Sequence, residues 1–182
     1  MVPVSSGNGG VNWFYALYRF DKAAGRFRAV GPEEFCNPEA RPAERILVTP
    51  CRSGPAWLDD AFQFAGDGRP YKYRENEVIA LRGFERDNAV TYLRRFRDAD
   101  GRVARSEVID PGEDKPAVRK IPVAQVYLYT APDDAARTTS YIIQGDVVEL
   151  LDVEQQPGQR QWLQIAYQSA RVGRMVRWIR LE

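Results

Sequence analysis

Hydrophobic and polar residues alternate along most of this chain, and aromatic residues are frequent at the apolar positions. The alternation is clearest over residues 13–20, 45–49, 61–64 and 89–93. A period of two places successive side chains on opposite faces of a strand, and helical periodicity is hard to find. Only residues 32–35, where a proline is followed by two glutamates, favour the start of a helix. The pattern therefore predicts an all-β protein.

A repeated pattern runs through the first 110 residues. Its three copies lie at residues 18–27, 62–69 and 94–103. Each copy has an aromatic strand, a tight turn with glycine, and a returning strand that begins at arginine. Glycine supplies the positive φ that such turns need. We therefore predict three antiparallel hairpins, arranged as a meander or as a partial propeller-like sheet.

The last sixty residues follow a different order of elements. An aromatic strand at 127–129 precedes a proline-containing turn at 131–134 and a strand at 141–151 that contains Gly-Asp-x-Val. A tryptophan strand at 162–165 and a closing Trp-Ile strand at 173–179 complete the order. This order resembles the bacterial SH3-like family. The resemblance implies a small β-barrel and a role in binding.

The clearest change in composition lies at residues 111–116, which contain two prolines, a glycine and three charged residues. Such a segment is typical of a linker. We therefore predict two domains. Residues 1–115 would form an N-terminal antiparallel sheet of hairpin repeats, and residues 120–182 a C-terminal SH3-like barrel.

A second resemblance concerns the N-terminal part, on residues 5–10, 15–27, 52–56 and 92–102. These segments are similar to a family of exported, β-rich, propeller-like immunity proteins of bacteria, which block lysozyme-like secreted effectors. That family usually has an acidic, calcium-type loop ahead of the Gly-Asn-Gly-Gly segment. The present sequence begins after that position, so the resemblance does not extend to calcium binding. A missing N-terminal portion would be consistent with the resemblance.

Charge and hydropathy exclude two classes of partner. The chain has 26 basic and 25 acidic residues, so it has no large uniform field to attract nucleic acid. It also has no run of about 18 apolar residues, which a membrane span requires. Residues 1–10 are small and polar rather than the charged and then apolar stretch of a signal peptide.

Two cysteines and no histidine limit the chemistry of the chain. A cysteine protease and a zinc site with histidine ligands are excluded by inventory. Cys36 and Cys51 either form a disulfide or remain two unlinked thiols. The even count and the short separation favour the disulfide, which would stabilise the fold by about 3 kcal/mol. A disulfide requires an oxidising compartment, so we expect a periplasmic or cell-envelope protein, with the signal peptide not present in this sequence.

No residue pattern predicts catalysis. The paired acids at 33–34, 59–60 and 133–134 are adjacent in sequence, so in a strand their side chains would face opposite sides. Asp98-Ala99-Asp100-Gly101 lacks the further ligands of a calcium loop, and a hairpin turn explains it better. We therefore expect a protein that is not an enzyme and that has no cofactor and no metal site.

The candidate residues are instead those that would contact a partner. Asn8 and Trp13 lie in or beside a small-residue loop, which would allow close approach. Tyr129, Tyr167 and the nearby Asp133 are candidates because a tyrosine beside a polar loop offers a flat apolar face and a hydroxyl. The two C-terminal tryptophans, by contrast, are expected in the core.

Two functions follow from these observations. The first is an exported bacterial immunity or inhibitor protein that binds and occludes a secreted cell-wall-degrading hydrolase. The alternative is an SH3-like envelope module that binds peptidoglycan or a peptide. Each of them is a binding function, and neither involves nucleic acid or a membrane span.

Overall fold

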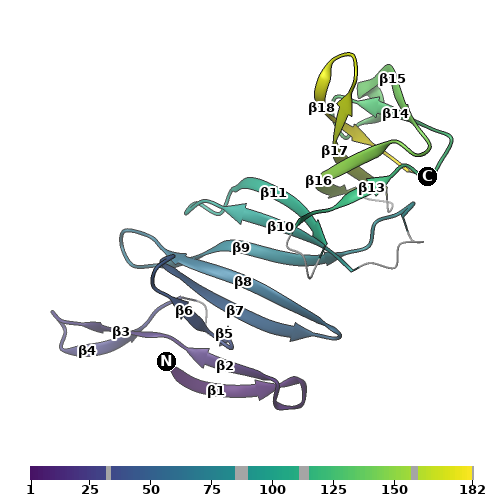
Figure 1. Cartoon of the computed structure of the whole chain (residues 1–182). Helices are drawn as coiled ribbons and strands as arrows, with labels where there is room; N and C mark the ends of the chain where they lie inside the picture. Colours follow the sequence, from purple (N-terminus) through teal and green to yellow (C-terminus); the bar gives the residue numbers. More distant parts are fainter. Residues whose placement is uncertain (32–33, 85–89, 111–114, 157–159, 182) are drawn as a thin grey trace. The chain divides into compact units, whose positions relative to one another are not determined.

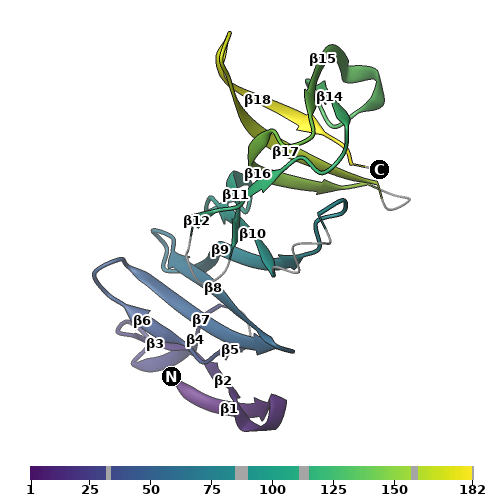
Figure 2. The same cartoon turned by 45° about the vertical axis from the view of Figure 1, so that its right-hand side comes forward.

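The computed structural model describes residues 1–31, 34–84, 90–110, 115–156 and 160–181 (Figures 1 and 2). Its regular structure consists of antiparallel strands, with short 3-10 segments at Asn8–Gly10 (η1) and Asp134–Ala136 (η3). The predicted all-β fold class is therefore confirmed. Within the described ranges, no helix is long and apolar enough to cross a membrane.

Two compact units make up the chain, and each is discontinuous in sequence. The first comprises residues 1–76 and 95–105, and the second residues 77–94 and 106–182. The division runs through three successive strands, whereas the predicted boundary lies at residues 115–120. Most of the predicted linker, residues 111–114, lies outside the described residues.

Five short strands of the first unit form two small sheets. Their bounds are β1 (Val2–Gly7), β2 (Asn12–Ala16), β3 (Tyr18–Asp21), β4 (Arg26–Ala29) and β5 (Phe35–Cys36). One sheet has the order β1-β2-β5, and the other is the β3–β4 hairpin. Phe35 thus begins a strand, so the expected helix is wrong there, while Pro32 and Glu33 lie outside the described residues.

The largest sheet is a meander in which the strands follow their order in the chain, β12-β11-β10-β9-β8-β7-β6 (Figure 1). The bounds are β6 (Glu39–Arg41), β7 (Ile46–Ser53), β8 (Ala56–Phe64), β9 (Pro70–Ile79), β10 (Thr91–Arg97), β11 (Val103–Asp110) and β12 (Lys115–Pro116). The three predicted hairpins are confirmed as β3–β4, β8–β9 and β10–β11. Gly25, Gly68 and Gly101 occupy their turns with φ of 63°, 81° and 82°.

A six-stranded antiparallel sheet forms most of the second unit, in the order β13-β16-β17-β18-β14-β15. The bounds are β13 (Val118–Lys120), β14 (Gln125–Tyr129), β15 (Arg137–Ile143), β16 (Val147–Gln155), β17 (Gln161–Ser169) and β18 (Gly173–Ile179). The segment between β13 and β14 bonds to the β15–β16 turn, through Ile121 N to Asp146 O (2.9 Å) and Gly145 N to Ile121 O (2.9 Å). These bonds bring the two ends of the sheet together.

The second unit has the larger apolar core. A cluster of sixteen buried residues includes Leu150, Ile165 and Ile179, and it also takes Leu81 and Leu93 from the earlier segment of that unit. Trp162 is fully buried, as the sequence predicts, whereas Trp178, which was also expected in the core, is only partly buried. The corresponding cluster in the first unit has three buried members, Ile46, Val48 and Ala61, with Tyr73 packed against them.

Candidate partner-binding site

The loop between β1 and β2 carries Asn8, one of the predicted partner-binding residues, and leads into Trp13, another. Asn8, Gly9 and Gly10 have φ of 50°, 67° and 83°. Asparagine and glycine adopt this left-handed conformation more readily than other residues. A Cβ atom added at Gly9 or Gly10 would meet no described atom within 4 Å. The tip of the loop therefore extends into open space.

A buried asparagine attaches this loop to β7. The Nδ2 of Asn12 donates a hydrogen bond to the carbonyl oxygen of Arg52 (2.9 Å), and the Oδ1 of Asn12 accepts one from the backbone N–H of Arg52 (2.9 Å). Asn8 Nδ2 donates a longer bond to the same carbonyl (3.3 Å). The Asn12 amide thus matches both backbone groups of Arg52, which is how a buried polar side chain avoids a desolvation penalty.

A second asparagine fixes the backbone at the start of β2. The Oδ1 of Asn37 accepts a hydrogen bond from the N–H of Trp13 (2.8 Å), and the N–H of Asn37 donates one to the carbonyl of Trp13 (2.7 Å). Its Nδ2 donates to the carbonyls of Val11 (3.2 Å) and Pro50 (2.9 Å). Asn37 itself has a left-handed φ of 43°. Its side chain therefore joins β2 to β7 while its backbone holds Trp13.

The predicted disulfide is present between Cys36 and Cys51, with Cα atoms 5.6 Å apart. It connects β5 to β7. Asn37 directly follows Cys36 and Arg52 directly follows Cys51, so the covalent bond lies beside both attachment points of the loop. The disulfide therefore lies next to the asparagine contacts that hold residues 11–13, and the longer bond of Asn8 to Arg52 holds the start of the loop.

Two tryptophan side chains remain half-exposed around this anchored loop. Trp13 is 48% exposed although its backbone is bonded on both sides, and Trp57 in β8 is 47% exposed. Trp57 lies directly opposite Arg52 in the β7–β8 register. The guanidinium of Arg52 is exposed, and its Nε donates to the carbonyl of Gly54 (3.1 Å). Tryptophan and arginine are the residue types that contribute most to protein–protein binding energy.

The structure does not bring the three C-terminal candidates to an equivalent surface. Tyr129 is 8% exposed, and its ring packs edge-on against Trp162 with centroids 4.8 Å apart. Tyr167 is half-buried against the core of the second unit. The expected exposed face is therefore absent at Tyr129 and reduced at Tyr167. Asp133 is exposed, and its Oδ1 accepts a hydrogen bond from Ala135 N (2.9 Å), which caps η3.

Tyr127, two residues before Tyr129, has the more accessible aromatic environment. The guanidinium carbon of Arg137 lies 3.5 Å from the centroid of its ring, and the exposed Tyr141 packs against it edge-on. Cation–π contact of this kind orients both side chains on the sheet surface. The group nevertheless has its polar and apolar partners already within the unit.

An ion-pair network joins β8, β9 and β10 in the first unit. Lys72 Nζ lies 2.8 Å from Asp60 and 3.4 Å from Glu75, and Arg97 lies 3.0 Å from Glu75. Burial alone would lower the pKa of Lys72, but the hydrogen bonds and charges of Asp60 and Glu75 together outweigh it and raise that pKa. Burial alone would raise the pKa of Glu75, but Arg97 and Lys72 outweigh it and lower that pKa.

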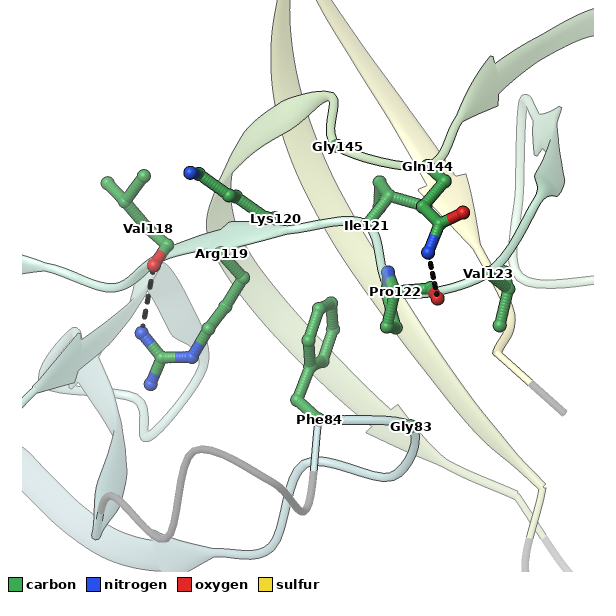
Figure 3. Close-up of a pocket in the computed structure, with 10 residues that line it drawn as sticks. All are labelled: Gly83, Phe84, Val118, Arg119, Lys120, Ile121, Pro122, Val123, Gln144 and Gly145. Carbon is green, nitrogen blue, oxygen red and sulfur yellow. Dashed lines mark hydrogen bonds between the residues drawn. The ribbon is translucent and has the colours of Figure 1, made fainter.

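A cavity of about 750 Å³ lies in the second unit, between the 83–84 turn, β13 and the β15–β16 turn (Figure 3). Phe84 projects from its turn toward the segment at Pro122, and Gln144 Nε2 donates to the carbonyl of Pro122 (3.4 Å). Arg119 also lines the cavity, but its guanidinium is bound to both carboxylate oxygens of Asp110 (2.5 and 2.7 Å). Lys120 is the exposed cation on this wall.

The acidic turn at residues 98–101 is a hairpin turn, as the sequence favours. Asp98 Oδ1 accepts hydrogen bonds from the N–H groups of Asp100 (3.0 Å) and Arg102 (2.9 Å), so its carboxylate organises the backbone of the turn. Among the described residues, no group of three or more histidine, cysteine, aspartate or glutamate side chains is placed to hold a metal ion.

Sequence reasoning identified Asn8 and Trp13 but missed three residues that define their surroundings. Asn12 bonds to a residue 40 positions away, and Asn37 bonds to residues 26 and 13 positions away. Trp57 lies in a segment whose alternation would look the same if its side chain were buried. Only the placement of asparagine within an otherwise aromatic strand could have indicated Asn12.

Comparisons with protein-family models, curated proteins and solved structures found no match for this chain.

Proposed function

We propose that this protein is an exported bacterial immunity or inhibitor protein, which binds a secreted cell-wall-degrading hydrolase and occludes its active-site cleft. The observation that carries the proposal is the anchored loop of the first unit. Asn12 and Asn37 hold the backbone at residues 11–13 beside the Cys36–Cys51 disulfide, while Trp13 remains half-exposed.

Rigidity matters because a loop that is already ordered loses little conformational entropy on binding. Fixing the backbone of one residue costs roughly 1–2 kcal/mol, and a loop whose backbone is already ordered avoids much of that cost on binding. Protein inhibitors that fill a cleft need this property. A disulfide also suits a protein that acts in an oxidising compartment, where a secreted hydrolase would be met.

The mechanism would be steric and would not require chemistry by this chain. The loop tip at Gly9 and Gly10 has no side chain, so its backbone can approach a cleft wall closely. Trp13 and Trp57 would supply buried apolar area beside the loop tip, with Trp13 as the central anchor, and Arg52 would contact carboxylates there. Many hydrolases of the cell wall act through carboxylates in a cleft. Filling that cleft excludes the glycan.

The test has two steps. The oxidised protein is used as bait to capture secreted muramidases and amidases from the native envelope, and each captured enzyme is then assayed for inhibition. We expect a stoichiometric complex in which hydrolysis of purified peptidoglycan stops. Trp13→Ala should weaken inhibition by about 30-fold or more, because truncating a central aromatic anchor costs about 2 kcal/mol or more.

The matched control is Phe64→Ala, because Phe64 is 47% exposed in the same unit but lies outside the loop. Inhibition by this variant should equal that of the unchanged protein. The proposal is wrong if no hydrolase is inhibited, or if Trp13→Ala and Phe64→Ala inhibit equally well.

A second candidate function rests on the cavity in Figure 3. The strand order of the second unit and its closure at residues 121–124 support an SH3-like barrel, and its cavity is flanked by Phe84, Pro122 and Lys120. Such a cleft would suit a peptide with a free carboxylate, as in a peptidoglycan stem. Tyr129 and Tyr167 would then support the barrel from its core rather than contact the ligand.

Binding to purified sacculi separates the two functions. If the second unit binds the wall, Lys120→Glu should release the protein, and Arg171→Glu, an exposed arginine on the β17–β18 turn, should not. Wall binding that survives Lys120→Glu would remove the cavity as the binding site.

A further inference from the structure

One face of the β3–β4 hairpin is aromatic and remains largely exposed in the part of the chain that the structure describes. Phe20 lies opposite Phe27 in the register, and Tyr18 lies opposite Ala29, so these four side chains share one face of the ribbon. Phe20 and Phe27 are in edge-on contact, with centroids 5.2 Å apart. Tyr18, Phe20 and Phe27 are nevertheless 46%, 49% and 67% exposed.

The opposite face of the hairpin is charged and is the one attached to the protein. It carries Arg19, Asp21, Arg26 and Arg28. Arg19 Nη1 donates to the carbonyl of Asp67 in the β8–β9 turn (3.3 Å). Strand alternation therefore directs the aromatic face away from that turn. In Figure 1 the hairpin extends from the end of β2, on the side opposite the β1–β2 turn.

An uncovered aromatic face of this kind is unusual, because a two-stranded ribbon is only marginally stable without packing on an apolar side. Exposed apolar patches rimmed by polar residues typically mark interaction surfaces. The face is also separate from the anchored loop in its residues and its attachments.

Charge identifies the kind of partner. The hairpin from Tyr18 to Ala29 has four basic residues and one acidic residue, Asp21. That acid is occupied, because Arg28 Nε lies 2.8 Å from it and it accepts hydrogen bonds from the turn backbone at Ala23 and Ala24. Among the described residues, Lys22 and Arg26 have no recorded ion pair.

Lys22 lies in the exposed turn at the tip of the hairpin rather than on its attached face, and its charge acts over a Debye length of about 8 Å at physiological salt. A second copy of this chain would bring a second positive hairpin against the first, and like charges across an interface cost binding energy. An acidic surface with an apolar centre complements both the aromatic face and the positive charge of the hairpin.

We propose that the aromatic face of the β3–β4 hairpin is a docking surface for a protein whose contact surface is acidic around an apolar centre. This surface is a second binding site, separate from the anchored loop, and the proposal does not depend on the identity of the loop's target. Phe27, the most exposed of the three aromatic residues, would be its central anchor, and Lys22 and Arg26 would supply its electrostatic rim.

The test uses a displayed library of a small three-helix protein scaffold with randomised surface positions, selected on the unchanged full-length protein. We expect the enriched binders to be acidic with apolar centres, and their affinity to fall as NaCl is raised. Phe27→Ser should weaken them by at least 30-fold and Phe64→Ser by less than 2-fold. Reversing the charges in Lys22→Glu/Arg26→Glu should weaken them by at least 10-fold with Phe27 intact.

Far-UV circular dichroism establishes that the variants fold, and Phe20→Ser provides a second test of the same face. Binders without acidic enrichment, or binders that tolerate Phe27→Ser, would overturn the proposal. It would also be overturned if sedimentation showed a dimer that Phe27→Ser dissociates, or if purified sacculi bound the unchanged protein but not Phe27→Ser. Those two results would assign the face to a second copy or to a wall polymer.

Discussion

The two units of this protein stabilise similar antiparallel sheets in different ways. The second unit buries sixteen apolar residues in one cluster, whereas the cluster of the first has three. The first unit instead has a disulfide and the side-chain amides of Asn12 and Asn37, which join separate strands. A unit cross-linked in this way can leave aromatic residues exposed, and those residues then become available to partners.

Truncation in the core of the second unit should have the largest effect. Trp162→Ala should lower the free energy of unfolding by about 3–5 kcal/mol, because it removes a fully buried aromatic side chain and leaves a cavity beside Tyr129. Trp13→Ala, at a half-exposed position of the first unit, should cost less than about 1 kcal/mol. Hydrogen exchange followed by mass spectrometry of peptides from each unit distinguishes the two losses. Equal losses would contradict the comparison.

Removal of the disulfide should affect the first unit alone. Cys36→Ala with Cys51→Ala should cost about 3 kcal/mol, the value expected for closing a loop of about 15 residues. Exchange should accelerate in peptides covering residues 8–13 and 35–52, and peptides covering β16 and β17 should be unchanged. Faster exchange throughout β16 and β17 would mean that the disulfide also stabilises the second unit.

Loss of a single buried amide should have the next largest effect. Asn12→Ala should destabilise the first unit by about 1–3 kcal/mol, because it leaves the N–H of Arg52 without its partner and the carbonyl of Arg52 with only the longer bond from Asn8. Asn8→Gly retains the left-handed backbone at an exposed position and serves as the control, with an expected change below about 0.5 kcal/mol. Chemical denaturation followed by Trp fluorescence measures both. A cost for Asn12→Ala no larger than that of Asn8→Gly would show that the amide does not anchor the loop.

The pH dependence of the first unit should be the smallest effect. The lowered pKa of Glu75 means that its contribution is present above the ordinary glutamate range and is lost as pH falls through the folded value. The raised pKa of Lys72 means that its contribution is present below the ordinary lysine range and is lost as pH rises through the folded value. The loss of unfolding free energy at acid pH (the acid limb) and the loss at alkaline pH (the alkaline limb) should each be below about 1 kcal/mol, because the pairs are partly solvated.

Glu75→Gln tests this prediction directly. It should remove the Glu75 part of the acid limb from thermal melts recorded between about pH 2 and 5, the range in which a glutamate titrates. The alkaline limb of Lys72 should persist, because Asp60 still contacts its ammonium group. If the loss of stability at acid pH is the same in Glu75→Gln, other carboxylates cause that loss.

The strands and hairpins could be predicted because they are properties of local sequence. Alternation and turn glycines located all three hairpins, and the spacing of the cysteines favoured their pairing. Tyr129 illustrates what local sequence does not contain. A β-bulge between Tyr127 and Tyr129 changes the phase of β14, so that Leu128 and Tyr129 are both buried although they are adjacent. Simple alternation cannot anticipate such a shift.

The candidate site was predictable only in part, for a similar reason. Asn8 and Trp13 stood out by type and by the small residues around them. Asn12 and Asn37 depend on Arg52 and Pro50, which are brought near only by the tertiary fold. The exposed face of the β3–β4 hairpin could not be distinguished from a buried one, because its alternation is the same in both cases.

The way the chain is shared between the units also limits how the protein can be cut or inherited. A fragment that began at residue 120 would contain all of β14–β18 but would lack Leu81, Phe84, Leu93 and Val108, which belong to the core cluster of the second unit. A gene fusion or a recombination event at the 111–116 segment would therefore transfer an incomplete core. Residues 77–94 are synthesised first, so they can complete their packing in the second unit only after the C-terminal strands have been made.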